Sequence, residues 1–171
     1  MEGEICVMGI DPGTVSMGYG IVRDRDGRTT ALQFGALTQQ ASTPLGLRLR
    51  NLYLGLVQIV DRYMPDVVAL EEPFVGNNVK VALALGRAQA IAILAAANQG
   101  ISIFQYSPAT VKQAVTNYGA SSKEQVQEMV KILLNLPQVP QPSDAADALA
   151  VALCHLQQSR LARFMSQKKT S

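Results

Sequence analysis

The sequence predicts an α/β protein whose sheet begins with three antiparallel strands. Short segments rich in valine and isoleucine have the length of strands, and from about residue 40 they alternate with longer segments of helical periodicity. The Asp26-Gly27 pair, between two strand-like segments, is typical of a tight hairpin and makes these strands antiparallel neighbours. The expected strands cover residues 5–11, 16–24, 29–38, 66–72 and 101–106.

Five longer segments have the patterns of helices. In residues 44–64, leucine, isoleucine and valine recur every three or four positions and form one apolar stripe. Ser122 lies three positions before Gln125, which is the spacing of a helix capping box, and Gly100 stands where a helix C-terminal signal is expected. The expected helices cover residues 44–64, 79–99, 108–118, 121–136 and a segment that begins at 143.

The length and composition fit a globular protein with a sizeable core. The chain has 171 residues, of which 48% are hydrophobic and 16% are charged, so long disordered charge tracts are not expected. No linker is long enough to divide the order βββαβαβααα. We therefore expect one domain over residues 1–164 and a disordered polar tail over residues 165–171.

The N-terminus and the cysteines indicate a cytoplasmic protein that does not contact a membrane. Two glutamates stand where a signal peptide would carry basic residues, and no uncharged apolar segment reaches membrane-spanning length. Cys6 and Cys154 lack metal-site spacing and are expected to be reduced and buried. The net charge of +2 does not decide for or against a nucleic-acid partner.

The segment SDAADALAVALCHL, residues 143–156, opens an apolar helix with two aspartates three positions apart. Such positions lie on one face of a helix with Cβ atoms about 5–6 Å apart, so Asp144 and Asp147 would repel each other unless a cation lay between them. The alternative is a capping role at the positive end of the helix dipole.

Two further carboxylates end apolar strands, and their burial is costly unless they are paired or bound to metal. Asp11 ends the first strand and Glu71 ends the fourth, so neighbouring strands would point both into one crevice with the aspartates of the last helix. Hard oxygen ligands select Mg²⁺ or Mn²⁺, and two such ions roughly 4 Å apart can hydrolyse a phosphodiester. His155 lies about 16 Å along the helix from Asp144 and is not expected to share their metal.

In these segments the sequence resembles the RuvC Holliday-junction endonucleases of the ribonuclease H-like superfamily. The ordered matches are GIDPGTVSMGYGIV, PDVVALEEPF, VKQAV, SSKEQVQEMV and SDAADALAVALCHL. The resemblance implies a ribonuclease H-like, mixed five-stranded sheet flanked by helices, and a Mg²⁺-dependent homodimer that nicks two strands of a four-way DNA junction. It also implies that the RuvA–RuvB branch-migration complex is a partner.

The family's catalytic and metal-binding acids match Asp11, Glu71, Asp144 and Asp147, although some members carry histidine at the position of Asp144. The adjacent Glu72 is expected to face the other way and to be solvated or to lie outside the direct ligands.

Three residues around the acids are candidates for DNA contact. Phe74 stands in a polar loop next to Glu71, where an aromatic ring can stack on an unpaired base, and the resemblance also places a junction-contacting aromatic there. Lys112 and Lys123 match basic positions that the family uses near DNA phosphates. The alternative for each lysine is a solvated surface side chain. The alternative for Phe74 is a loop side chain packed under its own turn.

The helix expected over residues 79–99 is apolar around much of its circumference, which predicts burial on more than one side and favours a twofold partner. Three other functions are open. An actin-like ATPase or sugar-kinase fragment would need a second phosphate loop and an adenosine site, and neither is found. A related nuclease acting on RNA would keep the acids, whereas a non-catalytic junction-binding protein would lose some of them.

Overall fold

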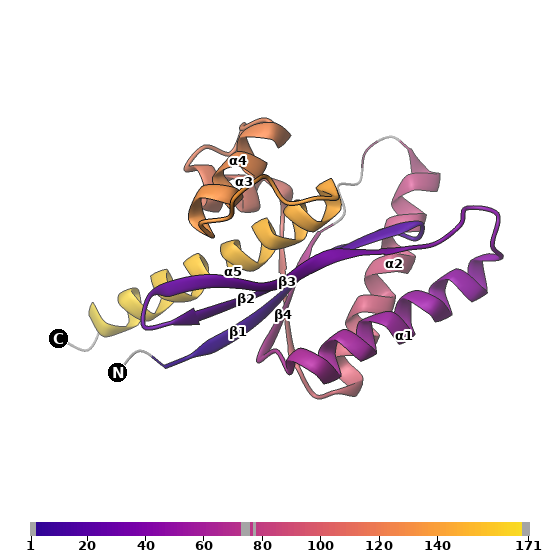
Figure 1. Cartoon of the computed structure of the whole chain (residues 1–171), viewed down its shortest axis with the longest axis horizontal. Coiled ribbons are helices and arrows are strands. Elements are labelled where there is room, and N and C mark those ends of the chain that lie inside the picture. Colours follow the sequence, from indigo (N-terminus) through magenta and orange to yellow (C-terminus); the bar gives the residue numbers. More distant parts are fainter. Residues whose placement is uncertain (1–2, 73–75, 77, 169–171) are drawn as a thin grey trace.

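The structure, a computed structural model, describes residues 3–72, 76 and 78–168 and contains one five-stranded sheet of order β3-β2-β1-β4-β5 (Figure 1). The first three strands are antiparallel, and β4 and β5 continue the sheet parallel to β1. The predicted mixed α/β sheet is therefore confirmed. The strands are β1 (Ile5–Asp11), β2 (Ser16–Arg25), β3 (Arg28–Thr38), β4 (Val67–Glu71) and β5 (Ser102–Tyr106).

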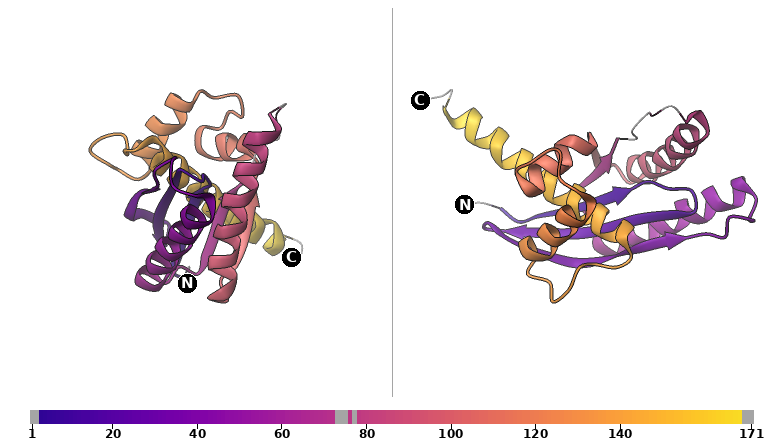
Figure 2. Two further views of the ribbon diagram at one scale, coloured as in Figure 1. Left: turned by 90° about the vertical axis from the view of Figure 1, so that its right-hand side faces the viewer. Right: turned by 90° about the horizontal axis from the view of Figure 1, so that it is seen from above.

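Helices cover both faces of the sheet (Figure 2). On one face, α1 (Leu45–Tyr63) and α2 (Val79–Asn98) pack against each other and share one hydrophobic core with the strands. On the other face, α5 (Ser143–Lys168) crosses β1 and β2 and is flanked by α3 (Pro108–Thr116) and α4 (Lys123–Leu133). The sheet thus separates two cores.

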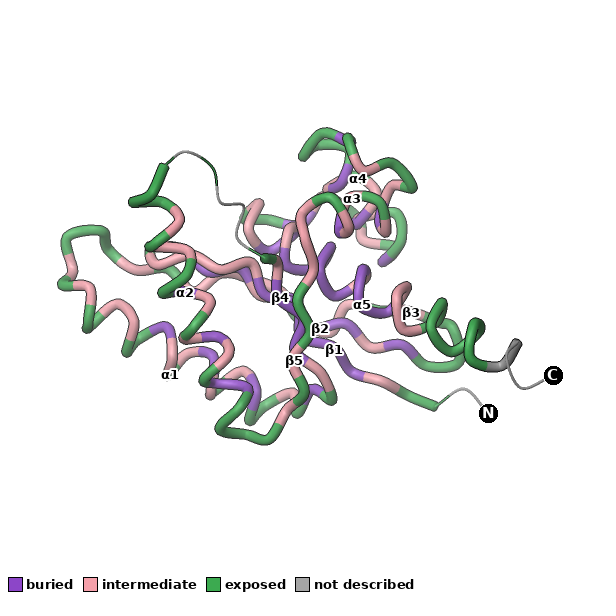
Figure 3. The backbone as a smooth tube through the Cα atoms, turned by 180° about the vertical axis from the view of Figure 1, so that it is seen from behind, coloured by how far each residue is buried: buried purple, intermediate pink, exposed green. Residues whose placement is uncertain are grey.

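The alternation of side chains along β1 shows which residues face each core. Met8 and Ile10 lie in the core with α1 and α2, whereas Val7 lies in the core with α5. Since successive strand residues point to opposite faces, Gly9 and Asp11 face α5 together with Val7. The end of β1 therefore directs Asp11 toward the helix that carries the paired aspartates. Figure 3 shows the central strands buried beneath these layers.

Two glycines allow α5 to lie unusually close to the sheet. A Cβ atom on Gly9 would overlap the carbonyl oxygen of Ala148, and one on Gly18 would overlap that of Asp144. The helix contributes small side chains to the same contact, including the fully buried Ala145. This close approach of backbone to backbone fixes the height of the first turns of α5 above β1 and β2.

Local turn and cap signals are found where the sequence predicts them. Asp26 and Gly27 have φ values of 51° and 83°, as a tight two-residue hairpin requires. Ser122 and Gln125 form the reciprocal capping box at the start of α4. Gly100 has a φ of 70°, the left-handed conformation that glycine adopts without strain after a helix.

The structure differs from the sequence prediction at the C-terminal end. Helix α5 continues to Lys168, so residues 165–168 of the expected disordered tail are helical. The reason is that residues 157–168 contain neither glycine nor proline and include several good helix formers. Figure 2 shows this part of α5 extending past the strands.

Helix α2 is long and apolar enough to cross a membrane when judged by length and composition alone, with a mean hydropathy of 1.6. The helix is not an uncharged segment of membrane-spanning length, because it contains Lys80 and Arg87. One such helix is weak evidence for a membrane span. Only 22% of the apolar window is buried, and Figure 3 shows much of the helix as intermediate or exposed. A large apolar surface of α2 is thus left uncovered.

Candidate active site

Three carboxylates converge where the end of β1 meets the start of α5. One oxygen each from Asp11, Asp144 and Asp147 lie within 4.8 Å of one another, and all three residues are partly buried. Glu71 is not a member of this set, but it ends the neighbouring strand β4 and faces the same side as Ala69, which lies in the core with α5. The parallel pairing of β1 with β4 therefore brings the predicted acids to one edge of the sheet.

The two aspartates of α5 have different partners. The Ser16 hydroxyl, at the start of β2, donates a hydrogen bond to Oδ2 of Asp144. The ammonium of Lys123, at the start of α4, lies 2.8 Å from Oδ2 of Asp147. A neutral donor thus holds one carboxylate, and a cation holds the other.

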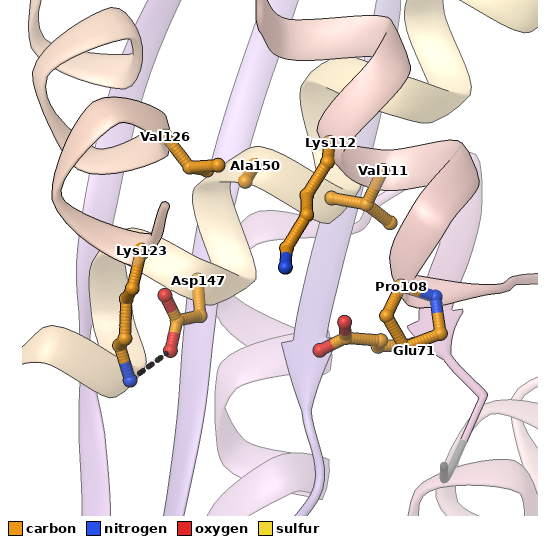
Figure 4. Close-up of a pocket in the computed structure, with 8 residues that line it drawn as sticks. All are labelled: Glu71, Pro108, Val111, Lys112, Lys123, Val126, Asp147 and Ala150. Atoms are coloured by element: carbon orange, nitrogen blue, oxygen red, sulfur yellow. Dashed lines mark ion pairs between the residues drawn. The ribbon is translucent and has the colours of Figure 1, made fainter. Parts of the chain in front are cut away.

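Beside these acids is a cavity of about 240 Å³ whose walls come from four elements (Figure 4). Glu71 points into it from β4, Lys112 from α3, and Asp147 lies on the opposite side beside Lys123. The apolar part of the wall consists of Pro108, Val111, Val126 and Ala150. The cavity therefore presents both anionic and cationic groups on a largely apolar support.

Burial and mutual repulsion raise the pKa values of two acids. Desolvation raises the pKa of Asp11 to about 8, and the charge of Asp147 is the next largest cause. Desolvation also raises the pKa of Glu71, again with repulsion from Asp147, although the nearby lysines oppose this shift. The hydrogen bond to Asp147 raises the pKa of the Lys123 ammonium. A nearby cation would therefore favour the ionised forms of Asp11 and Glu71.

The donor set fits a hard divalent cation. Three carboxylate oxygens within 4.8 Å of one another can reach one ion, since oxygen ligands of Mg²⁺ and Ca²⁺ lie about 2.0–2.6 Å from the metal. The helix-capping alternative for Asp144 has less support, because its carboxylate accepts a hydrogen bond from β2. The acidic cluster could therefore bind a metal ion.

Three other residues near the acids in the sequence are His155, Glu72 and Phe74. His155 is buried on α5, away from the acids, where Nδ1 lies 2.8 Å from the Tyr106 hydroxyl and burial lowers the pKa of the imidazole. Glu72 is exposed, as expected. Phe74 lies outside the described residues.

Ser16 was not singled out from the sequence, because nothing in the pattern of a strand-start serine marks a contact with a residue 128 positions away. Both cysteines are buried and free, as predicted.

A family model described as crossover junction endodeoxyribonuclease RuvC matches residues 7–155. The chain belongs to the RuvC family. It is 51% identical over 161 residues to the RuvC of Dehalococcoides mccartyi, an alignment that covers 94% of this chain and 98% of the relative. It is 50% identical over 153 residues to the RuvC of Desulforamulus reducens, covering 90% of this chain and 94% of the relative.

Solved RuvC structures have the same architecture. A Thermus thermophilus RuvC structure is 32% identical, with a TM-score of 0.85 over 92% of this chain and 97% of that one. A second, T. thermophilus RuvC in complex with a Holliday junction substrate, is 31% identical, with a TM-score of 0.84 over 92% and 96%. The yeast mitochondrial Holliday junction resolvase Ydc2, at 15% identity and a TM-score of 0.66, shares the fold. The predicted ribonuclease H-like fold is therefore confirmed.

Proposed function

We propose that this chain is a metal-dependent endodeoxyribonuclease that resolves four-way DNA junctions by paired, symmetric nicks. The observation that carries the proposal is the convergence of Asp11, Asp144 and Asp147 at the sheet edge of a RuvC-family fold. The similarity to a T. thermophilus RuvC solved with a Holliday junction supports the substrate. No histidine is needed near the acids, because a metal held by these carboxylates would activate a water for attack and stabilise the leaving oxygen.

Asp11, Asp144 and Asp147 would hold the metal, with Glu71 supplying a fourth carboxylate from β4. We propose two Mg²⁺ ions, for which Mn²⁺ can substitute, because an all-carboxylate donor set suits hard cations. The chain's own part in the chemistry is to fix these oxygens on a strand end and a helix start, where backbone movement is small. Burial of Asp11 and Glu71 disfavours their charged forms and increases the benefit of a nearby cation.

Lys112 and Lys123 would contact DNA phosphates on either side of the cavity. Lys112 points into it opposite Asp147 (Figure 4). Lys123 stands in the first turn of α4, where free backbone N–H groups and the helix dipole also favour an anion. Phe74 is proposed to stack on an unpaired base of the junction, a role that rests on sequence and family resemblance.

A homodimer through α2 would provide two sites for two symmetric strands. The buried side chains of α2 are all alanines: Ala88, Ala92, Ala95 and Ala96. Its exposed side includes Val79, Leu83 and Leu94, which are 70%, 55% and 49% exposed and lie on one face at helical spacing. A twofold contact of these faces would cover the apolar surface without a membrane.

The dimer predicts a change of mass in solution. Leu83→Glu should convert a dimer to a monomer in size-exclusion chromatography with light scattering, because the new carboxylate would be buried against its symmetry mate. Ile132→Glu, at a 63% exposed position on α4, is the matched control and should leave the mass unchanged. A dimer that persists in Leu83→Glu would exclude this face.

The nuclease activity is tested by cleavage of three substrates with Mg²⁺ and with EDTA. A four-way junction should be nicked at symmetric positions in Mg²⁺, and linear duplex and RNA–DNA hybrid should not. A nuclease acting on RNA would cut the hybrid instead, and a non-catalytic binding protein would retain the junction without cutting it. Binding of the RuvA–RuvB complex is proposed on family resemblance, and a cytoplasmic location on the N-terminal sequence and the two free cysteines.

A further inference from the structure

The hydrogen bond from Ser16 to Asp144 joins two segments that are 128 positions apart. Ser16 is the first residue of β2, and Asp144 lies in the first turn of α5. Within the part of the chain that the structure describes, Ser16 is the one hydrogen-bond donor to the Asp144 carboxylate. This contact joins the Asp144 carboxylate to the start of β2.

The backbone around Ser16 is fixed on both sides. Ser16 pairs with Thr38 of β3, and the Gln39 amide donates a hydrogen bond of 2.7 Å to the Val15 carbonyl. Gly13 lies so close to the Ser16 carbonyl that a Cβ atom at this position would overlap it. The donor is thus held by a tight turn and a sheet pair, and the same turn connects it to Asp11.

The hydroxyl also selects among the orientations open to Asp144. A carboxylate in the first turn of a helix can turn back to the free N–H groups of its own helix. The contact with Ser16 instead holds it on the β2 side, within reach of the Asp11 and Asp147 oxygens. The hydroxyl brings no positive charge to Asp144 and bonds to one of its two oxygens, whereas Asp147 is paired with the Lys123 ammonium.

We propose that Ser16 is a positioning residue for the metal centre: it preorganises Asp144 for a divalent cation without competing for that cation. Its effect on cleavage rests on the proposed function, whereas its effect on metal affinity does not. Residues that orient metal ligands by hydrogen bonds typically change metal affinity by about 10–100-fold when removed. Since the fold places Ser16 on the sheet, its loss should leave the rest of the site in position.

The test measures Mn²⁺ binding by calorimetry in the absence of DNA. Ser16→Ala should bind Mn²⁺ about tenfold more weakly than wild type, and Ser16→Thr, which keeps the hydroxyl, should recover most of the affinity. Ser102→Ala is the matched control, because Ser102 is the exposed first residue of β5. It should bind Mn²⁺ as wild type does.

Cleavage of a four-way junction provides the second measurement. Ser16→Ala should need about tenfold more Mg²⁺ for half-maximal cleavage, whereas its rate at saturating Mg²⁺ and its junction binding in EDTA should stay near wild type. Equal Mn²⁺ affinities for Ser16→Ala and Ser102→Ala would overturn the proposal.

A folding failure of Ser16→Ala and a failure of the proposed nuclease function would give different results. If Ser16→Ala does not fold, the Mn²⁺ affinities of Ser16→Thr and Ser16→Val are compared instead. These two side chains have nearly the same shape and differ by the hydroxyl, so equal affinities would overturn the proposal. If wild type binds Mn²⁺ but does not cut junctions, the proposed function fails while the affinity comparison still tests Ser16.

Discussion

The ammonium of Lys123 lies 2.8 Å from the carboxylate of Asp147 and so joins the start of α4 to the face of α5 that carries the paired aspartates. In the metal-free protein this ammonium supplies part of the positive charge that a bound cation would otherwise supply. The side chains of Lys123 and Asp147 are 53% and 20% exposed, so solvent weakens their attraction. We therefore expect a cation bound at Asp147 to weaken this ion pair.

Lys123→Met should destabilise the metal-free protein by about 1 kcal/mol or less, because the ion pair is partly solvated and the acids lose a counter-charge. In Mg²⁺ this difference should shrink, since the metal neutralises the same carboxylates. Urea unfolding in EDTA and in Mg²⁺ measures both values. Lys131→Met, which removes the 3.4 Å ion pair with Glu128 on the same helix, is the control and should not respond to Mg²⁺. If Mg²⁺ changes the stability of both variants by the same amount, cation binding is not linked to the Lys123–Asp147 ion pair.

Asp147→Asn should abolish junction cleavage and preserve the fold. An amide is nearly isosteric with a carboxylate but is a poorer ligand for Mg²⁺. Because we expect basic residues to make the phosphate contacts, junction binding in EDTA should remain. Asp26→Asn, at the hairpin position with a φ of 51°, is a matched control that should cut normally. Cleavage by Asp147→Asn within tenfold of wild type would argue against a metal site at Asp147.

The same variant tests whether the acids share a cation. Mg²⁺ at a hundredfold excess over Kd should stabilise wild type by about 2.7 kcal/mol, because it binds the folded state alone. Asp147→Asn should lose most of this gain. In EDTA its stability should change by less than about 1 kcal/mol, since the lost ion pair is offset by weaker repulsion on Asp11. A wild-type melting temperature that ignores Mg²⁺ would contradict the shared cation.

The raised pKa of Asp11 predicts that the metal-free protein loses stability as the pH rises. In the unfolded chain Asp11 ionises near the ordinary aspartate pKa of 3.8, whereas in the folded protein its pKa is raised to about 8. Between these values the folded state binds more protons, so each pH unit should lower the unfolding free energy by up to about 1.4 kcal/mol. Denaturant unfolding in EDTA between pH 5 and 8 measures the slope.

Asp11→Asn is the control for this slope, because it removes the titrating group. Its stability should fall less steeply with pH than that of wild type. Parallel slopes for the two proteins would show that Asp11 does not titrate in this range. Saturating Mg²⁺ should flatten the wild-type slope, since the cation favours the ionised carboxylate.

Much of this fold could be predicted because its signals are local. The hairpin at Asp26-Gly27 needs two residues with positive φ, and the start of α4 needs a side chain at Ser122 to accept backbone N–H bonds, so each leaves a mark in a few neighbouring positions. Asp11 and Glu71 could be assigned to one site, because burying a carboxylate at the end of an apolar strand is costly unless it is paired or bound to metal.

The contacts that complete the site could not be predicted, since they join segments far apart in the chain. The partners of the two α5 aspartates, Ser16 and Lys123, depend on how closely α5 approaches the sheet and on where α4 begins in space. A serine at the start of a strand or a lysine in the first turn of a helix has many possible roles, and no local pattern distinguishes them. The helix continues to Lys168 through a segment whose polarity suggests a disordered tail, because polarity alone does not end a helix.

The close approach of α5 to β1 gives a prediction for Gly9. A Cβ atom there would overlap the Ala148 carbonyl oxygen and crowd the Ala152 amide, both of which are backbone atoms that cannot rotate away. Gly9→Ala should therefore push α5 away from the sheet and lower the unfolding free energy by about 3 kcal/mol, as overpacking in a rigid core does. The displacement should also weaken Mg²⁺ binding, because Asp144 and Asp147 move with the helix.

Gly46→Ala separates this packing effect from the general effect of replacing glycine. Gly46 lies on α1, and a Cβ atom there would have no atom within 4 Å. Because alanine favours the helix and restricts the unfolded chain, this variant should be more stable than wild type, by up to about 1 kcal/mol. Denaturant unfolding and Mn²⁺ calorimetry of both variants measure the contrast. If Gly9→Ala kept wild-type stability and metal affinity, α5 would have room to approach the sheet without glycine, and the spacing of the acids would depend on something else.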